Sequence, residues 1–77
     1  MYTRKFKYNQ WDVQLEGRRN GNFHFVKVSC DGGWFCVNGS LYAGEDCVRY
    51  DYPDSVPQGL KDKINKVAHK MLAQLEF

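Results

Sequence analysis

The chain has 77 residues, a formal net charge of +2 and an aromatic content of 16%. A chain this short forms a single domain, here residues 1–77, which buries only about 60% of the surface that its unfolded state exposes. The small net charge does not by itself indicate a nucleic-acid-binding protein. No stretch approaches the roughly 18 apolar residues of a membrane span, and no apolar signal segment follows Met1, so we expect a cytoplasmic protein.

The first two segments alternate residue types with the period of two that is typical of β-strands. In residues 2–8 the alternate positions include basic side chains, which suits an edge strand or a loose arm, because lysine discourages edge-to-edge pairing. In residues 10–16, Trp11, Val13 and Leu15 alternate with polar residues. This pattern predicts a strand with one buried face and one face in water.

A hairpin turn is expected after the second segment. Asn20-Gly21 is the strongest local hairpin signal in the chain. Arg18 and Arg19 lie next to this turn, so both guanidinium groups are expected on an exposed tip. Arginine in such a position can make bidentate contacts with a carboxylate or a phosphate.

The strand expected over residues 23–30 is apolar on both faces. Val26 and Val28 share one face, and Phe23 and Phe25 lie on the other. Two phenylalanines therefore fall on the opposite side from the valines that a core would use.

Residues 34–43 allow two structures: one strand with a bulge at Asn38-Gly39, or a hairpin of two short strands. We favour the bulged single strand because it leaves a simple meander. Residues 47–52 are expected to form the last strand, with Tyr50 and Tyr52 on the same face as Val48.

The last third of the chain, about residues 55–76, predicts an amphipathic α-helix. Ser55 and Gln58 have the spacing of a capping box at its start. The apolar positions that form one stripe along this helix are Leu60, Ile64, Val67, Ala68, Met71, Leu72 and Leu75.

Together these segments predict an α+β fold. We expect an antiparallel meander of four or five strands over about residues 2–52, with the C-terminal helix packed on one face. One helix cannot cover both faces of a sheet, so some aromatic residues should remain exposed as an interaction surface. As anchors of a partner-binding site we select Phe23, Phe25, Tyr50 and Tyr52, and as orienting charges Arg18 and Arg19.

The three cysteines do not predict a disulfide framework, because their number is odd. Cys30 and Cys36 flank a turn, so a single bridge between them is geometrically possible. A zinc site of these two with Cys47 and His69 has suitable ligand types but lacks a C-x2-C pair. The simplest interpretation is three reduced thiols, and we expect no metal and no cofactor.

Catalytic signatures are missing from the sequence. The only histidines are His24 and His69, and neither is part of a recognisable Ser/His/Asp arrangement. Asp31-Gly32-Gly33 precedes an expected strand rather than a helix, so it is not a phosphate-binding loop. We therefore expect a protein that is not an enzyme.

Protein binding is the leading function class. Its alternatives are a symmetric homodimer that buries the same aromatic residues, and plain cross-strand packing of aromatics on a wet face. Direct binding of single-stranded RNA or DNA by an aromatic, basic sheet face is the runner-up. Nine acidic residues against eleven basic ones make it the weaker hypothesis.

In size and architecture the chain resembles the small inhibitors that phages produce against host defences, of which anti-CRISPR proteins are the best-known group. Many of these are compact α+β domains that are not enzymes and that occupy a surface of a CRISPR effector complex. The resemblance covers the whole chain in these two respects and rests on no shared motif, so it assigns no functional residue. It implies an inhibitor that acts in the host cytoplasm on a protein or nucleoprotein complex.

Overall fold

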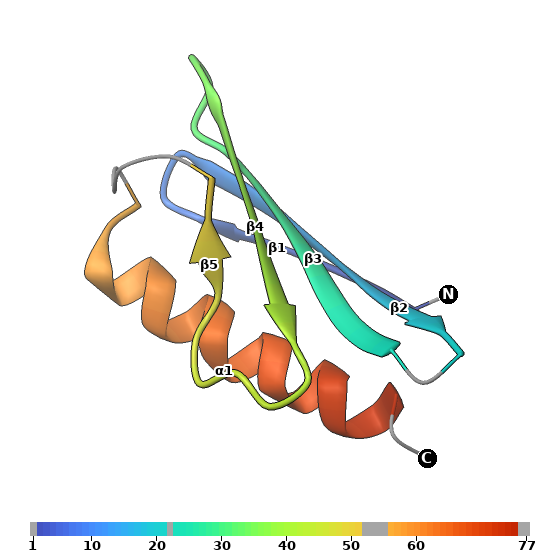
Figure 1. Cartoon of the computed structure of the whole chain (residues 1–77). Helices are drawn as coiled ribbons and strands as arrows, with labels where there is room; N and C mark the ends of the chain where they lie inside the picture. Colours follow the sequence, from blue (N-terminus) through green and yellow to red (C-terminus); the bar gives the residue numbers. More distant parts are fainter. Residues whose placement is uncertain (1, 22, 52–55, 76–77) are drawn as a thin grey trace.

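The computed structural model of the chain describes residues 2–21, 23–51 and 56–75, which form a sheet and one helix in two layers (Figure 1). The strands are β1 (Tyr2–Tyr8), β2 (Trp11–Asn20), β3 (Phe23–Asp31), β4 (Cys36–Tyr42) and β5 (Arg49–Tyr50), and the helix is α1 (Gln58–Leu75). The predicted α+β fold, an antiparallel meander followed by a C-terminal helix, is confirmed.

The sheet has five strands in the order β1-β2-β3-β4-β5, so every strand lies beside its neighbour in the sequence. All pairs are antiparallel. The N-terminal segment is a strand rather than a loose arm, because its register with β2 runs without interruption from Tyr2↔Gly17 to Tyr8↔Trp11. This strand forms one edge of the sheet.

The fourth strand is single, as we favoured, but the expected bulge is wrong. Its register with β3 is continuous from Phe25↔Tyr42 to Asp31↔Cys36 and passes directly through Asn38-Gly39. Gly39 allows β4 and the neighbouring segment to pack closely and does not form a bulge. A Cβ atom at Gly39 would lie 2.7 Å from the carbonyl oxygen of Arg49 and 2.8 Å from Cγ1 of Val48.

The fifth strand is much shorter than the expected segment 47–52. Only Arg49 and Tyr50 pair with β4 in the described part of the chain, and Tyr52 lies outside the described residues. The register Gly39↔Tyr50 places Tyr50 over the glycine, where the two chains approach closely.

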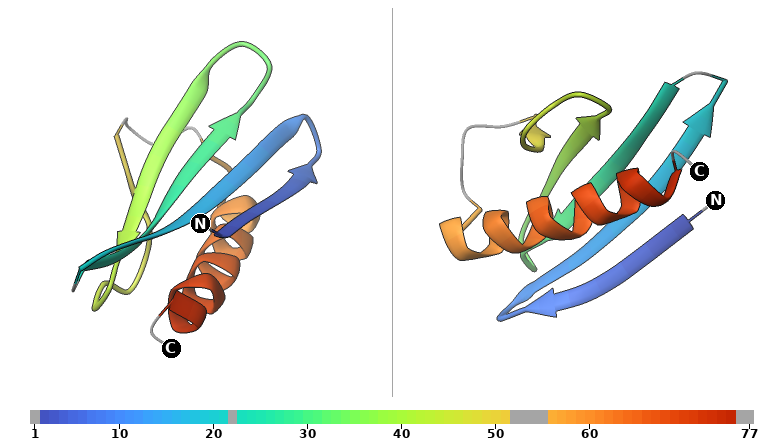
Figure 2. Two further views of the ribbon diagram at one scale, coloured as in Figure 1. Left: turned by 90° about the vertical axis from the view of Figure 1, so that its right-hand side faces the viewer. Right: turned by 90° about the horizontal axis from the view of Figure 1, so that it is seen from below.

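The helix lies across one face of the sheet and contacts β2 and β3, as the view from below shows (Figure 2). It begins at Gln58, and the expected cap Ser55 is outside the described residues. Its stripe is as predicted, with Val67 and Leu75 only partly buried. The fully covered positions are Leu60, Ile64, Ala68, Met71 and Leu72.

The core lies between the helix and alternate residues of the central strands. The buried strand residues that face α1 are Trp11, Val13, Leu15, Val26, Val28, Cys30, Val37 and Leu41. Val48 and Val56, from the segments on either side of β5, extend this cluster. Because each large apolar side chain contributes about 1.5–3 kcal/mol when it is fully buried, this single layer of contacts supplies most of the stabilisation of the domain.

The close approach of the two strands at Gly39 predicts the sign of the change in unfolding free energy when a methyl group is added there. Replacing a strand glycine by alanine ordinarily stabilises by about 0.5–1 kcal/mol. Here Gly39→Ala should instead destabilise by about 1–3 kcal/mol, because the methyl group would overlap the backbone of Arg49. Urea unfolding measures the difference. Ser40→Ala, at the neighbouring position on the opposite face of the strand, is the control, and its unfolding free energy should stay within about 0.5 kcal/mol of the wild type. A stabilised Gly39→Ala variant would show that β5 does not pack against Gly39.

Candidate functional site

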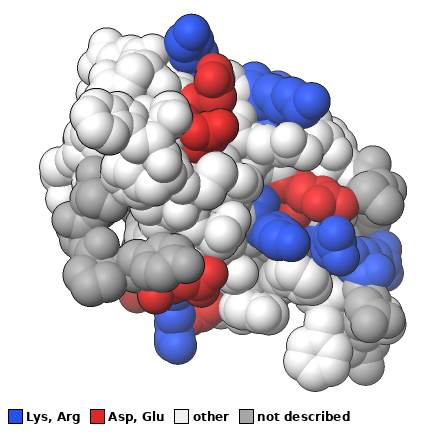
Figure 3. Space-filling model, turned by 90° about the horizontal axis from the view of Figure 1, so that it is seen from above, with Lys and Arg blue, Asp and Glu red and all other residues white. Residues whose placement is uncertain are grey.

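The sheet surface opposite α1, here called the open face, is polar at its centre. Gln14, Glu16, Lys27, Ser29 and Asn38 line a small hollow there. Acidic and basic side chains are interspersed on this side of the molecule rather than segregated by sign (Figure 3). The middle of the open face is therefore hydrated, and the aromatic residues that the helix leaves uncovered lie elsewhere on the sheet.

Two exposed aromatic residues and the half-buried Phe25 gather at one end of the open face, beside the β2–β3 turn. We call this group, made of Arg18, Phe23, Phe25 and Tyr42, the hairpin-end patch. The register aligns Arg18, Phe25 and Tyr42 in one row across three strands. The rings of Phe25 and Tyr42 are stacked, with centroids 5.2 Å apart and an interplanar angle of 26°. Phe23 is 71% exposed and Tyr42 is 47% exposed.

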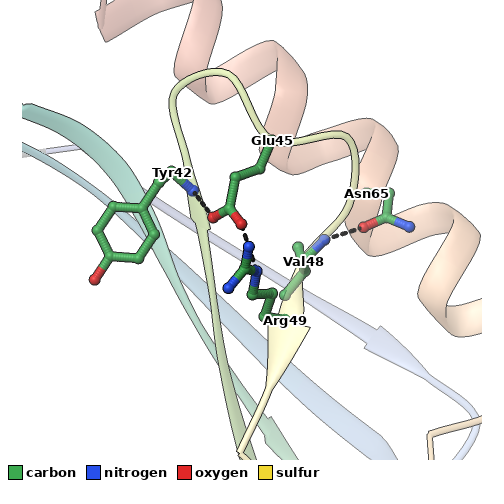
Figure 4. A network of polar contacts seen from close by, with 5 residues as sticks. All are labelled: Tyr42, Glu45, Val48, Arg49 and Asn65. Atoms are coloured by element: carbon green, nitrogen blue, oxygen red, sulfur yellow. Dashed lines mark hydrogen bonds and ion pairs between the residues drawn. The ribbon is translucent and has the colours of Figure 1, made fainter.

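A tight turn after β4 fixes the position of Tyr42 (Figure 4). The backbone N–H of Glu45 donates to the carbonyl oxygen of Tyr42 at 3.0 Å, and the Glu45 carboxylate accepts from the N–H of Tyr42 at 3.1 Å. Gly44 adopts a φ of +92° in this turn, a conformation that glycine reaches without strain. The backbone of Tyr42 is thus hydrogen-bonded at both its N–H and its carbonyl oxygen, which fixes this half of the stacked pair.

Two arginines near the patch already have carboxylate neighbours. Arg18 forms an ion pair with Glu16 at 3.3 Å, and Nε of Arg49 lies 2.5 Å from the Glu45 carboxylate. Exposed pairs of this kind contribute about 0–1 kcal/mol, so their main effect is on local charge and orientation. The positive potential around the patch is therefore partly neutralised.

The loop before β5 is attached to the helix by two polar contacts. The N–H of Val48 donates to Oδ1 of Asn65 at 2.9 Å, and Nε2 of His69 lies 2.6 Å from the carbonyl oxygen of Asp46. His69 is exposed, and its ring holds this loop. These contacts fix the chain on both sides of Cys47.

Three of the six selected site residues, Arg18, Phe23 and Phe25, come together in the patch. Arg19 pairs with His24, and strand alternation directs it to the opposite side of the sheet from Arg18. Tyr50 is half-buried and packs against the core on the helix side. Tyr52 lies outside the described residues. The patch gains Tyr42, which the selection had left out.

A second exposed aromatic group lies at the other end of the sheet, on the β3–β4 turn. Trp34 is 94% exposed, and Phe35 packs edge-on against Trp11 with centroids 5.5 Å apart. The turn is closed by the N–H of Gly32, which donates to the carbonyl oxygen of Phe35 at 3.0 Å. The turn signal immediately before Trp34 could have placed this side chain on a tip.

The cysteines are free thiols in the structure. Cys30 is buried in the core, whereas Cys36 and Cys47 are exposed, and no disulfide joins them. Within residues 2–21, 23–51 and 56–75, no three His, Cys, Asp or Glu side chains cluster in a way that could hold a metal ion. In the same residues no helix has the length and apolar character needed to cross a membrane.

Comparisons with protein-family models, curated proteins and solved structures found no match to this chain.

The environment of Cys30 predicts an alkaline loss of stability. Burial, with a smaller contribution from the nearby Cys36, raises the pKa of the Cys30 thiol from 9.0 to about 11. The pKa of this thiol is higher in the folded state than in the unfolded state. The stabilisation that results is therefore complete below pH 9 and is lost as the pH rises toward 11. Urea unfolding at about pH 8 and about pH 10.5 should show a larger loss for the wild type than for Cys30→Val.

Cys47→Ala is the matched control, because it removes an exposed thiol and should keep the wild-type pH dependence. Equal pH dependence of the wild type and Cys30→Val would show that the Cys30 thiol ionises in the folded state as easily as in the unfolded one.

Proposed function

We propose that this chain is a non-enzymatic binding protein that acts by occupying a surface of a larger protein partner through the hairpin-end patch. The observation that carries this proposal is the exposure of Phe23, at 71%, beside the stacked rings of Phe25 and Tyr42. A cluster of aromatic residues on a rigid sheet, next to an arginine, has the composition of an interface centre.

The energetics favour a small anchor site. Full burial of a phenylalanine side chain contributes about 1.5–3 kcal/mol, and the half-exposed ring of Tyr42 adds further apolar area. The stacked pair and the turn at Glu45 hold the rings in place, so little side-chain entropy is lost on docking. The polar centre of the open face would form the hydrated rim of such an interface.

Direct binding of single-stranded RNA or DNA is the second candidate, and the stacked rings of Phe25 and Tyr42 are the observation that favours it. The local charge favours it less. Arg18 and Arg49 are paired with Glu16 and Glu45, so these two guanidinium groups are less available to a phosphate backbone. We therefore place protein binding first.

Inhibition of a CRISPR effector complex, implied by resemblance in size and architecture, stays a prediction within this proposal. A partner of that class would be a nucleoprotein, so the captured partner has to be tested for its dependence on nucleic acid as well as on the patch.

Capture from a native-host lysate tests the proposal. The immobilised protein should retain a partner that resists nuclease treatment, and the double change Phe23→Ser with Phe25→Ser should reduce its recovery at least about tenfold. Trp34→Ser, which alters an exposed aromatic at the opposite end of the sheet, is the matched control and should retain the partner. Circular dichroism checks that each variant is folded, and Phe23→Ser alone replaces the double change where that variant unfolds.

The salt dependence separates the two candidates. Binding to nucleic acid through six to ten phosphates would weaken by about 10³–10⁵ between 50 and 200 mM salt. An aromatic protein interface should lose far less. Nuclease-sensitive capture with that steep salt dependence would favour the nucleic-acid candidate, and undiminished capture by both Phe23 variants would exclude the hairpin-end patch as the site.

A further inference from the structure

The outer edge of β1 is an open edge of the sheet. All register partners of Tyr2–Tyr8 lie on β2, and no other strand in the described part of the chain pairs with β1. The strand is seven residues long, whereas β5 at the opposite edge has two. An edge of this length can accept the backbone of an added strand.

A cavity of about 400 Å³ lies between β1 and the C-terminal half of α1. Tyr2 and Arg4 line it from the strand, and Val67, Lys70 and Met71 line it from the helix. Side chains of a strand added to β1 alternate between the two faces of the sheet. Those on the helix side would enter this cavity, while those on the other side would lie beside Lys5 and Lys7.

The edge is positively charged. Between Tyr2 and Tyr8 the sequence has Arg4, Lys5 and Lys7 and no acidic residue. The register partner of Lys5 is the uncharged Gln14, and that of Lys7 is Asp12. From the helix, Nζ of Lys63 lies 4.6 Å above the ring of Phe6, which brings a further cation over the same strand.

From this combination we infer that β1 accepts an extended segment of a partner protein with alternating acidic and apolar residues, which adds to the sheet as a sixth strand. Main-chain hydrogen bonds to β1 supply affinity, and the alternate side chains supply specificity. The acidic side chains pair with Lys5 and Lys7 on the open-face side. The apolar ones fill the cavity lined by Tyr2, Val67 and Met71.

A second copy of the chain is a poor occupant of this edge. An antiparallel pair of β1 strands would bring three basic residues from each copy together, six in all, without a carboxylate from either strand. Like charges directly opposite each other destabilise strand pairing. An acidic segment has the complementary charge.

The inferred site does not depend on the hairpin-end patch. The patch lies on the open face of β2, β3 and β4, whereas the edge site uses β1 and α1. Substitutions at one surface therefore leave the other unchanged, and the two proposals can fail separately.

A synthetic peptide tests the inference. Fluorescently labelled acetyl-Glu-Val-Glu-Val-Glu-Val-Glu-amide should bind the full chain with a Kd of about 1–100 µM in fluorescence anisotropy at low salt. The peptide with lysine in place of every glutamate should not bind. Two analogues, each N-methylated on one of the two alternate sets of amides, separate backbone pairing from charge attraction. At least one of them should bind about tenfold more weakly than the parent.

Variants locate the site. Lys5→Glu should weaken binding of the parent peptide by about tenfold or more. Lys66→Glu makes the same charge change at an exposed helix position outside the cavity lining and should change binding less than about twofold.

Equal binding of the parent and both N-methylated analogues, equal weakening by both variants, or no binding at all would overturn the inference. So would a concentration-dependent dimer in sedimentation velocity that Lys5→Glu alters and Lys66→Glu does not, because a second copy would then occupy the edge.

Discussion

The packing of α1 against one face of the sheet is the constraint on which the rest of the structure depends. Leu60, Ile64 and Met71 lie in one core cluster with the alternate apolar residues of β2, β3 and β4. With a single helix in the described chain, the opposite face has to be stable in water on its own. The hairpin-end patch is a consequence of how the sequence builds that uncovered side.

Residue type on the uncovered face varies with position along the strands, and this keeps the face stable in water. Polar residues such as Gln14, Ser29 and Asn38 occupy the centre of the open face, and the exposed aromatic groups lie at the two ends of the sheet. As a result, the molecule exposes two small apolar surfaces instead of one broad one, with Phe23 near one end and Trp34 at the other. A partner that docks at an end needs only a small complementary pocket, which suits recognition by a domain of this size.

Strict periodicity made much of the fold predictable. The alternation of Trp11, Val13 and Leu15 and the helical stripe named the core correctly, because burial on one side forces a repeat of two or 3.6 residues. The prediction of a bulge at Gly39 was wrong, because a glycine needed for a close approach looks the same in sequence as one needed for a bulge. Tyr50 shares a face with the buried Val48, and this pattern indicates a side chain packed against the core rather than an exposed anchor.

Photo-CIDNP NMR tests the one-sided cover most directly, because a photoexcited flavin polarises only the tryptophan, tyrosine and histidine rings that it can touch. In dilute protein we expect a strong signal from Trp34, which is 94% exposed, a signal from Tyr42, and none from Trp11, which is 5% exposed. A polarised Trp11 would show that the helix does not cover its face of the sheet. Silence of Trp34 and Tyr42 in the monomer would show that the rings are already covered and that no docking surface remains.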